Sequence, residues 1–184
     1  MILPIYAYGQ PVLRRRGADI DKSYENLSTL LDNMWETMYN AKGIGLAAPQ
    51  IGKPIRIFLV DTVQLEDDEK NLKGIKKVLI NPEMIEEFGP EDAYEEGCLS
   101  IPDVRGDVIR NTEIKVKYFD ENFQEHTETY AGINARVIQH EYDHIEGKLF
   151  IEKLQPLKKR LVKRKLENIK KGKVGVDYRM RFAK

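Results

Sequence analysis

The sequence predicts an α+β fold in which antiparallel β-sheets pack around a central helix, with one further helix near each end of the chain. Segments with helical periodicity and segments with strand-like alternation are segregated rather than alternating as β–α–β units. We find no internal repeat and no linker, and 184 residues with 41% hydrophobic and 33% charged content suit one core. We therefore expect a single domain over residues 1–184, with residues 155–184 forming a basic C-terminal helix and tail.

The N-terminal half contains one expected helix and two short strands. Residues 23–40 carry apolar side chains every three to four positions, and Ser23 is a plausible N-cap. Residues 55–60 and 77–80 are β-rich, and the second run is expected to end at the Asn–Pro pair that follows it. Residues 64–74 are highly charged and lack apolar periodicity, which predicts an exposed loop.

The C-terminal half is expected to form a hairpin and then two helices. Residues 113–119 and 124–130 alternate in strand fashion around a turn. Residues 132–146 change to helical periodicity, and this central helix would carry the candidate metal ligands. A terminal amphipathic helix begins at Pro156 and ends before Gly172.

The central helix contains an H-E-x-x-H pattern formed by His140, Glu141 and His144. Four-residue spacing places both imidazoles on one face, about one helical turn apart, with a carboxylate beside them. Such a group can hold a metal ion and act as a base toward water. The alternative is a helix with two buried, hydrogen-bonded histidines. We favour a hydrolytic metal site, because two of the chain's three histidines lie in this pattern.

A catalytic site of this kind needs a third protein ligand, and the best candidate is Cys98. No histidine follows the motif, and few acidic residues lie downstream of it. Cys98 is the single cysteine, and a thiolate is a strong, soft ligand, although a lone cysteine is often a small buried apolar residue. Asp143 and Arg110 are candidates for orienting the ligands; a surface carboxylate and a structural ion pair are the alternatives.

Three segments together resemble the signature motifs of the peptide deformylase family, in the family's order. They are Gly-Ile-Gly-Leu-Ala-Ala-Pro-Gln at 43–50, Glu-Gly-Cys-Leu-Ser at 96–100 and Gln-His-Glu-Tyr-Asp-His at 139–144. Lesser similarity, including Arg105 and residues 147–150, extends the match over nearly the whole chain. The resemblance implies a metal-dependent hydrolase that removes the formyl group from the N-terminal formyl-methionine of new polypeptides and releases formate.

The resemblance also implies the catalytic set. Cys98, His140 and His144 would bind one divalent metal ion, with Fe²⁺ favoured and Zn²⁺, Ni²⁺ and Co²⁺ also allowed. A water on the metal would be the nucleophile, and Glu141 would be the general base and acid. The side-chain amide of Gln50 and the backbone N–H of Leu99 would stabilise the oxyanion.

Seven residues would bind the substrate in the same interpretation: Gly43, Ile44, Gly45, Gly97, Arg105, Ile133 and Val137. The segment 43–45 would pair with the peptide backbone as a strand, and two glycines would leave room for it. Three apolar side chains would line a methionine pocket, and the arginine would lie near the peptide. Arg136 places a charge where we expect an apolar residue beside that pocket.

The charge distribution suggests a polyanionic partner. Residues 153–184 contain 13 Lys and Arg against two acids, a net charge of +11, while the other 152 residues contain 17 basic and 28 acidic residues, a net charge of −11. With the family resemblance, this predicts contact with ribosomal RNA as nascent formyl-methionyl peptides emerge. A solvated helix is the alternative. Removal of the chain from Pro156 onward is expected to preserve turnover of short peptides.

Other features bear on compartment and on rival functions. A single cysteine excludes an intramolecular disulfide, and the N-terminus does not resemble a signal or transit peptide, so we expect a cytoplasmic monomer without membrane contact. A zincin-like metallopeptidase would need a ligand downstream of His144. A non-enzymatic, metal-stabilised RNA-binding module would leave Glu141 without a role.

Overall fold

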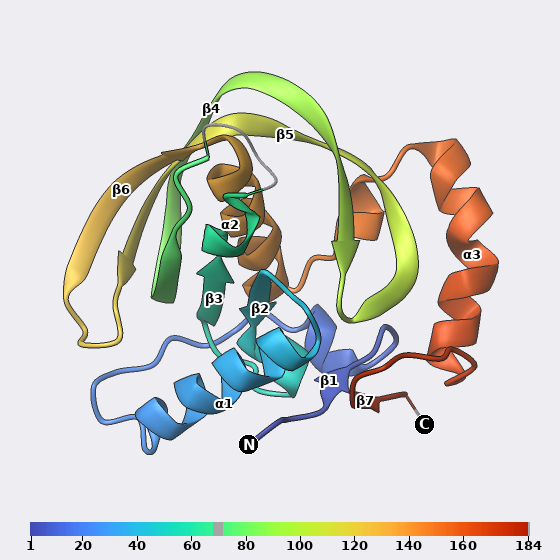
Figure 1. Cartoon of the computed structure of the whole chain (residues 1–184), viewed down its shortest axis with the longest axis horizontal. Helices are drawn as coiled ribbons and strands as arrows, with labels where there is room; N and C mark the ends of the chain where they lie inside the picture. Colours follow the sequence, from blue (N-terminus) through green and yellow to red (C-terminus); the bar gives the residue numbers. More distant parts are fainter. Residues whose placement is uncertain (68–71, 184) are drawn as a thin grey trace.

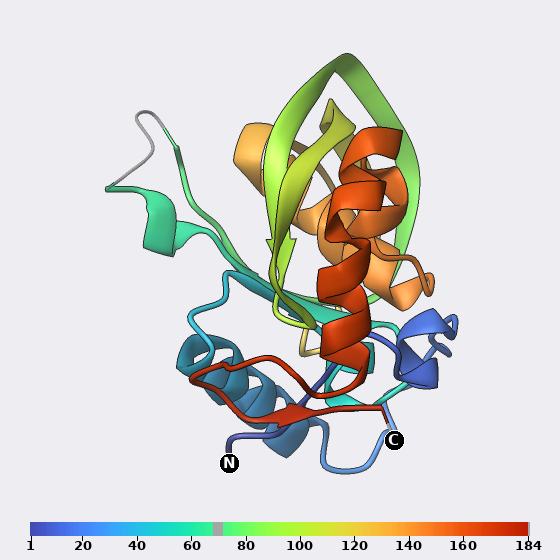
Figure 2. The same ribbon diagram turned by 90° about the vertical axis from the view of Figure 1, so that its right-hand side faces the viewer.

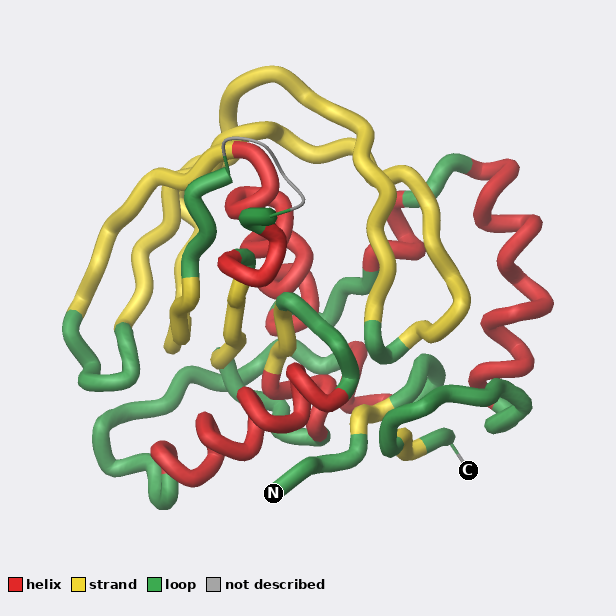
Figure 3. Tube along the Cα trace, in the orientation of Figure 1, coloured by secondary structure: helices red, strands yellow, loops and turns green. Residues whose placement is uncertain are grey.

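The computed structural model describes residues 1–67 and 72–183, and it has the predicted α+β architecture (Figures 1 and 3). Its helices are α1 (Leu27–Asn40), α2 (Gly132–Ile145) and α3 (Pro156–Lys170). Its strands are β1 (Ile5–Tyr6), β2 (Gly45–Ala47), β3 (Ile57–Asp61), β4 (Lys76–Cys98), β5 (Ile101–Phe119), β6 (Glu125–Ala131) and β7 (Met180–Arg181). Short 3₁₀ turns occupy Pro11–Arg14, Ala48–Ile51, Val63–Leu65 and Phe150–Lys153.

One antiparallel sheet dominates the molecule. Five strands pair in the order β2-β3-β4-β5-β6, while β1 and β7 form a separate two-stranded sheet that is parallel. The expectation of antiparallel sheets is therefore confirmed for the large sheet only. Strands β4 and β5 arch over the top of the molecule, and α2 lies in the centre beneath them (Figure 1).

Strand β4 runs much further than the sequence suggested. The Asn–Pro pair does not end it, because Asn81 takes a left-handed conformation (φ 48°) and forms a bulge between Ile80 and Glu83. The Asn81 side chain also exchanges two hydrogen bonds with the backbone of Ile20, at 3.0 and 2.7 Å. Pro82 has no N–H to donate to the sheet, and it lies within this bulge. Pairing with β5 therefore resumes after it and continues to Cys98.

Helix α1 begins later than predicted. Asp21 accepts hydrogen bonds from the backbone and hydroxyl of Ser23, at 2.8 and 2.5 Å, so Ser23 belongs to a preceding turn rather than to an N-cap. Asn26 then adopts a left-handed conformation (φ 58°) directly before the first helical residue. The helix buries Leu30, Leu31, Met34 and Met38 against the core, as the periodicity predicted.

Helix α2 matches its prediction closely. It starts at Gly132 (φ 58°), and Gly147 follows its end with φ 72° as a C′ glycine. Its buried face contacts β2, β3 and β5 and contributes Ala135, Ile138 and Ile145 to a core shared with the sheet. This packing against the large sheet fixes the helix, and so it also fixes the side chains of α2 that face the cleft.

The two ends of the chain meet below the sheet. Figures 1 and 2 show α3 along one side, followed by a tail that returns to place β7 beside β1. Helix α3 buries Val162 and Ile169 and ends before Gly172, as predicted. Of the predicted 64–74 loop, residues 68–71 lie outside the described residues, and a 3₁₀ turn begins it. No helix within the described residues is long and apolar enough to cross a bilayer.

Candidate metal centre and active site

A cleft of about 550 Å³ opens between the β2 edge, the β4–β5 turn and α2. Twelve of the thirteen predicted site residues line it: Gly43, Ile44, Gly45, Gln50, Gly97, Cys98, Leu99, Arg105, Ile133, Val137, His140 and Glu141. The thirteenth, His144, is buried one helical turn further along α2, with 2% of its surface exposed. Segments far apart in the sequence are thus brought to one hollow.

Cys98, His140 and His144 converge at the floor of the cleft. Their candidate ligand atoms all lie within 4.8 Å of one another, and Cys98 Sγ is 3.3 Å from His144 Nε2. The imidazole rings of His140 and His144 are 5.1 Å apart and nearly perpendicular. Burial, together with the charges of His140 and Arg110, places the pKa of His144 well below its usual value, which favours the neutral form of this ring. A neutral imidazole is the form that binds a metal.

This donor set fits a divalent metal ion. One thiolate and two imidazoles leave a fourth tetrahedral position open, which is the arrangement of catalytic rather than structural zinc-type sites. Beside them, Glu141 Oε2 is buried and has no hydrogen-bond partner among the described residues. A buried carboxylate oxygen without a partner is costly unless another group completes the site. The geometry therefore suits an ion with a water molecule adjoining Glu141.

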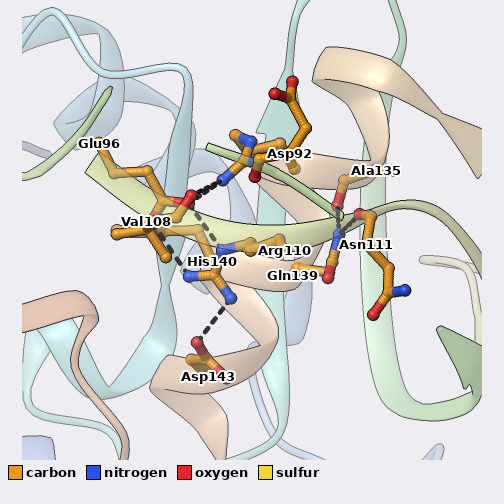
Figure 4. A network of polar contacts seen from close by, with 10 residues as sticks. Asp92, Glu96, Val108, Arg110, Asn111, Ala135, Gln139, His140 and Asp143 are labelled. Carbon is orange, nitrogen blue, oxygen red and sulfur yellow. Dashed lines mark hydrogen bonds and ion pairs between the residues drawn. The ribbon is translucent and has the colours of Figure 1, made fainter. Parts of the chain in front are cut away.

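Glu96 orients one of the histidines from behind (Figure 4). Its Oε2 is 2.9 Å from His140 Nδ1, which leaves Nε2 of that ring for the metal side. Arg110 donates two hydrogen bonds to the same carboxylate, at 2.6 and 3.0 Å, and a third, at 2.9 Å, to Asp143. Burial alone would raise the pKa of Glu96, but the hydrogen bonds from His140 and Arg110 hold it well below the usual value.

Arg136 belongs to this network rather than conflicting with the pocket. Its guanidinium donates to Glu96 at 3.0 Å, to the Val108 carbonyl at 2.9 Å and to the Asp92 carbonyl at 2.8 Å. It also lies over the ring of Tyr94. The charge is therefore compensated inside the protein, and the apolar lining of the cleft can come from its neighbours Ile133 and Val137.

Glu141 lies on the same helix and faces the cleft. Only 4% of its surface is exposed, and this burial raises its pKa to about 7, although the charges of His140 and Arg110 oppose the shift. Its carboxylate lies against Gly45, where a Cβ atom would overlap it. The room at Gly45, predicted for substrate, is thus needed for Glu141. A carboxylate with a pKa near neutrality is suited to accept and return a proton.

Gln50 points its amide nitrogen at the cysteine loop. Its oxygen accepts from the Ala47 N–H at 2.8 Å, so its NH₂ group faces Cys98 Sγ at 3.5 Å and Ser100 Oγ at 3.2 Å. Leu99 stands at the turn between β4 and β5, and its side chain fills the space beside Gly43, where a Cβ would approach it to 2.7 Å. Both predicted oxyanion donors therefore adjoin Cys98.

The remaining predicted residues lie on the rim. Arg105 is exposed and donates to Glu95 at 2.9 Å, and its guanidinium lies beside Gly97, 2.8 Å from where a Cβ of that residue would be. The segment 43–45 is not a full strand, since β2 starts only at Gly45.

Sequence reasoning missed the role of Glu96. The only sequence signal for this role is the position of Glu96, two residues before Cys98 in the Glu-Gly-Cys-Leu-Ser segment.

Comparisons with known proteins agree with this geometry. The family model described as polypeptide deformylase matches residues 2–160. A peptide deformylase of Christiangramia forsetii is 59% identical over 189 residues, covering 99% of this chain and 96% of the relative. The Legionella pneumophila peptide deformylase structure has a TM-score of 0.81 at 37% identity, covering 93% and 96% of the two chains. The Thermotoga maritima structure has a TM-score of 0.75 at 38% identity, covering 85% and 99%. The chain belongs to the polypeptide deformylase family.

Proposed function

We propose that this protein removes the formyl group from the N-terminal formyl-methionine of newly made polypeptides and releases formate. The observation that carries the proposal is the convergence of Cys98, His140 and His144 on one point beside the buried carboxylate of Glu141. Family membership favours this function over a zincin-like metallopeptidase and over a non-enzymatic RNA-binding module. The third ligand comes from upstream of the helix, whereas the endopeptidase interpretation required one downstream.

The chemistry divides among the residues of the cleft. When bound by the three ligands, a divalent ion would lower the pKa of a water molecule and polarise the formyl oxygen. Glu141 accepts a proton from the attacking water and then delivers it to the peptide nitrogen as the C–N bond breaks. The Gln50 amide and the Leu99 N–H donate to the developing oxyanion, each typically worth about 3–4 kcal/mol.

Substrate selection follows from the walls of the cleft. The peptide would lie along the edge at Gly43–Gly45, and Ile44, Ile133 and Val137 would contact the methionine side chain. Arg105, exposed on the opposite rim, would lie near the peptide. A formyl carbon carries only hydrogen, so a close approach of the turn at Gly97–Leu99 would exclude larger acyl groups.

We further propose Fe²⁺ as the ion, because a Cys/His₂ set accepts it and the family resemblance favours it over Zn²⁺, Ni²⁺ and Co²⁺. The protein would act in the cytoplasm as a monomer, with residues 1–184 forming one catalytic domain. Residues 155–184 would supply its basic helix and tail.

The function is tested by formate release from the anaerobically purified protein. A formyl-Met peptide should release formate, and the acetyl-Met peptide of the same sequence should be cleaved at least about a hundredfold more slowly. Metal content measured on the same sample identifies the ion. Equal rates on both peptides, or cleavage at an internal peptide bond, would contradict the proposal.

A contact with the ribosome is the second part of the proposal. Lys159, Arg160, Lys163 and Arg164 are exposed on α3, and phosphate contacts from such a helix are sequence-independent. Deleting the chain from Pro156 is a poor test, because the same deletion would remove β7 and its pairing with β1. Replacing the exposed basic side chains with Gln would remove the charge and retain β7 with its pairing to β1.

A further inference from the structure

The turn that joins Cys98 to Ser100 is held by both ends of the chain. The Tyr8 N–H, just after β1, donates to the Ser100 carbonyl at 2.8 Å. From the C-terminal tail, the Tyr178 hydroxyl donates to the Leu99 carbonyl at 2.8 Å. Strands β1 and β7, which pair with each other, place these two donors (Figure 1).

The tail reaches the turn from outside the residues that the family model matches. That match ends at residue 160, whereas Tyr178 lies eight residues beyond the end of α3. The tail is fixed at several points: Gln10 donates to the Phe182 carbonyl at 2.7 Å, and the Ile5 N–H donates to the Arg179 carbonyl at 2.9 Å. The Tyr178 ring is half-buried and packs against the core that contains α1.

The peptide groups of this turn have strict positional requirements in the proposed reaction. Leu99 N–H belongs to the peptide that follows the candidate ligand Cys98, and the Leu99 carbonyl belongs to the next peptide. Fixing that carbonyl restricts rotation about the Leu99 backbone and so limits how far the N–H can turn from its direction. A donor displaced by a few tenths of an ångström loses oxyanion stabilisation, because such donors act through preorganised geometry.

We propose that Tyr178 is a positioning residue for catalysis, whose hydroxyl holds the Cys98–Ser100 turn so that the Leu99 N–H stays aimed at the reacting carbonyl. Tyr178 does not line the cleft, so it acts through Leu99 rather than on the substrate. This inference rests on the proposed deformylase function. It assigns the C-terminal tail a role in the active site that is separate from the charge of α3.

The test compares Tyr178→Phe with Tyr6→Phe in the full-length metal-loaded protein. The first change removes only the hydroxyl that reaches Leu99. The control removes a hydroxyl that accepts from Arg181 at 3.2 Å, which joins the two termini without touching the turn. Steady-state kinetics with a formyl-Met peptide, the melting temperature, and hydrogen exchange of the segment around Leu99 are measured for each.

For Tyr178→Phe we expect kcat to fall about three- to tenfold with KM within about twofold, because the Leu99 N–H that Tyr178 positions acts on the oxyanion of the transition state. Exchange around Leu99 should rise while exchange in α2 stays unchanged. Tyr6→Phe should match the wild type in its kinetics and in its hydrogen exchange around Leu99. Unchanged kcat and exchange in Tyr178→Phe would overturn the proposal, as would equal losses of activity and melting temperature in both variants. Absence of formate release by the wild type would instead overturn the proposed function, and the exchange measurement would still decide whether Tyr178 holds the turn.

Discussion

Glu96, behind the cleft, and Glu128, on the sheet, are both surrounded by hydrogen-bond donors. Glu96 accepts from Arg110, Arg136 and His140, and only 5% of its side chain is exposed. Glu128 on β6 accepts from Lys77, at 2.9 and 3.1 Å, and from the hydroxyls of Tyr118 and Tyr130, and 35% of its side chain is exposed. Both carboxyl groups have a lowered pKa, so the local chemistry is similar.

The difference lies in what each cluster is connected to. The Glu96 cluster ends on a candidate metal ligand and joins β4, β5 and α2, so a change there alters the metal site. The Glu128 cluster joins β4, β5 and β6 and includes none of the proposed site residues. The comparison teaches that a depressed carboxyl pKa marks function only when a reactive group shares the hydrogen bonds.

Between the two clusters, the larger effect should come from Glu96→Gln. The change leaves two buried guanidinium groups without their carboxylate, which typically costs about 3–5 kcal/mol of folding stability. It also weakens the group that orients His140, for which metal affinity typically falls about 10–100-fold. Urea unfolding and a metal titration check the two effects. Glu128→Gln serves as the control, and metal binding should be the same in that variant as in the wild type. Equal loss of metal affinity in both variants would remove the distinction between the clusters.

A smaller effect, present at neutral pH and lost in acid, is expected on the stability of Glu128→Gln. Burial raises the pKa of Glu128, but hydrogen bonds from Tyr118, Tyr130 and Lys77 outweigh it and lower the value to about 2. The unfolded chain takes up this proton near pH 4.3, so Glu128 stabilises the fold above that pH. The contribution is lost as the pH falls from there toward 2.

The measurement is the free energy of unfolding of wild type and variant between pH 7 and pH 2. The wild type should be more stable at pH 7, and the difference should shrink as the solution is acidified. Glu125→Gln is the matched control, because Glu125 is on the same strand and pairs with Lys117 at the surface. A difference that stays constant with pH would show that Glu128 contributes no charge-dependent stability.

The smallest effect on turnover should come from replacing Lys159, Arg160, Lys163 and Arg164 with Gln. These side chains are solvated on α3, so hydrolysis of short peptides should stay within about twofold of the wild-type rate. Affinity for ribosomes should fall, and its salt dependence should become shallower. The control replaces four exposed lysines elsewhere with Gln: Lys22, Lys53, Lys115 and Lys148. Equal ribosome binding by both variants would disprove the docking role of α3.

The sequence predicted the helices better than the sheet. The apolar spacing in α2 and α3 is local, and a glycine follows each helix, so both were recognised within a few residues of their ends. The middle of β4, around Glu86–Glu95, has mostly exposed and acidic side chains and no apolar alternation. That part is a strand because β5 pairs with it, which is a long-range property that the residues do not reveal locally.

The same distinction applies to the site. Cys98, His140 and His144 can be predicted as metal ligands because they lie in short sequence motifs of residue types that bind metals. Glu96 could not, since its role depends on Arg110 from β5 and on Arg136 from α2. The charge of Arg136 beside the expected methionine pocket has no explanation in the sequence for the same reason, since its hydrogen-bond partners come from β4 and β5. Side chains that act through other side chains become visible only when the fold brings their partners together.

Glu141→Gln tests most directly whether Glu141 moves the proton while three other side chains hold the metal. Glutamine keeps the size of the side chain but cannot accept the proton, so metal content should equal that of the wild type. Formate release should fall by about 10²–10⁴-fold, the usual contribution of a general base. Metal analysis and a formate assay on the same preparation measure both. A variant that keeps its metal and still deformylates at the wild-type rate would contradict the account.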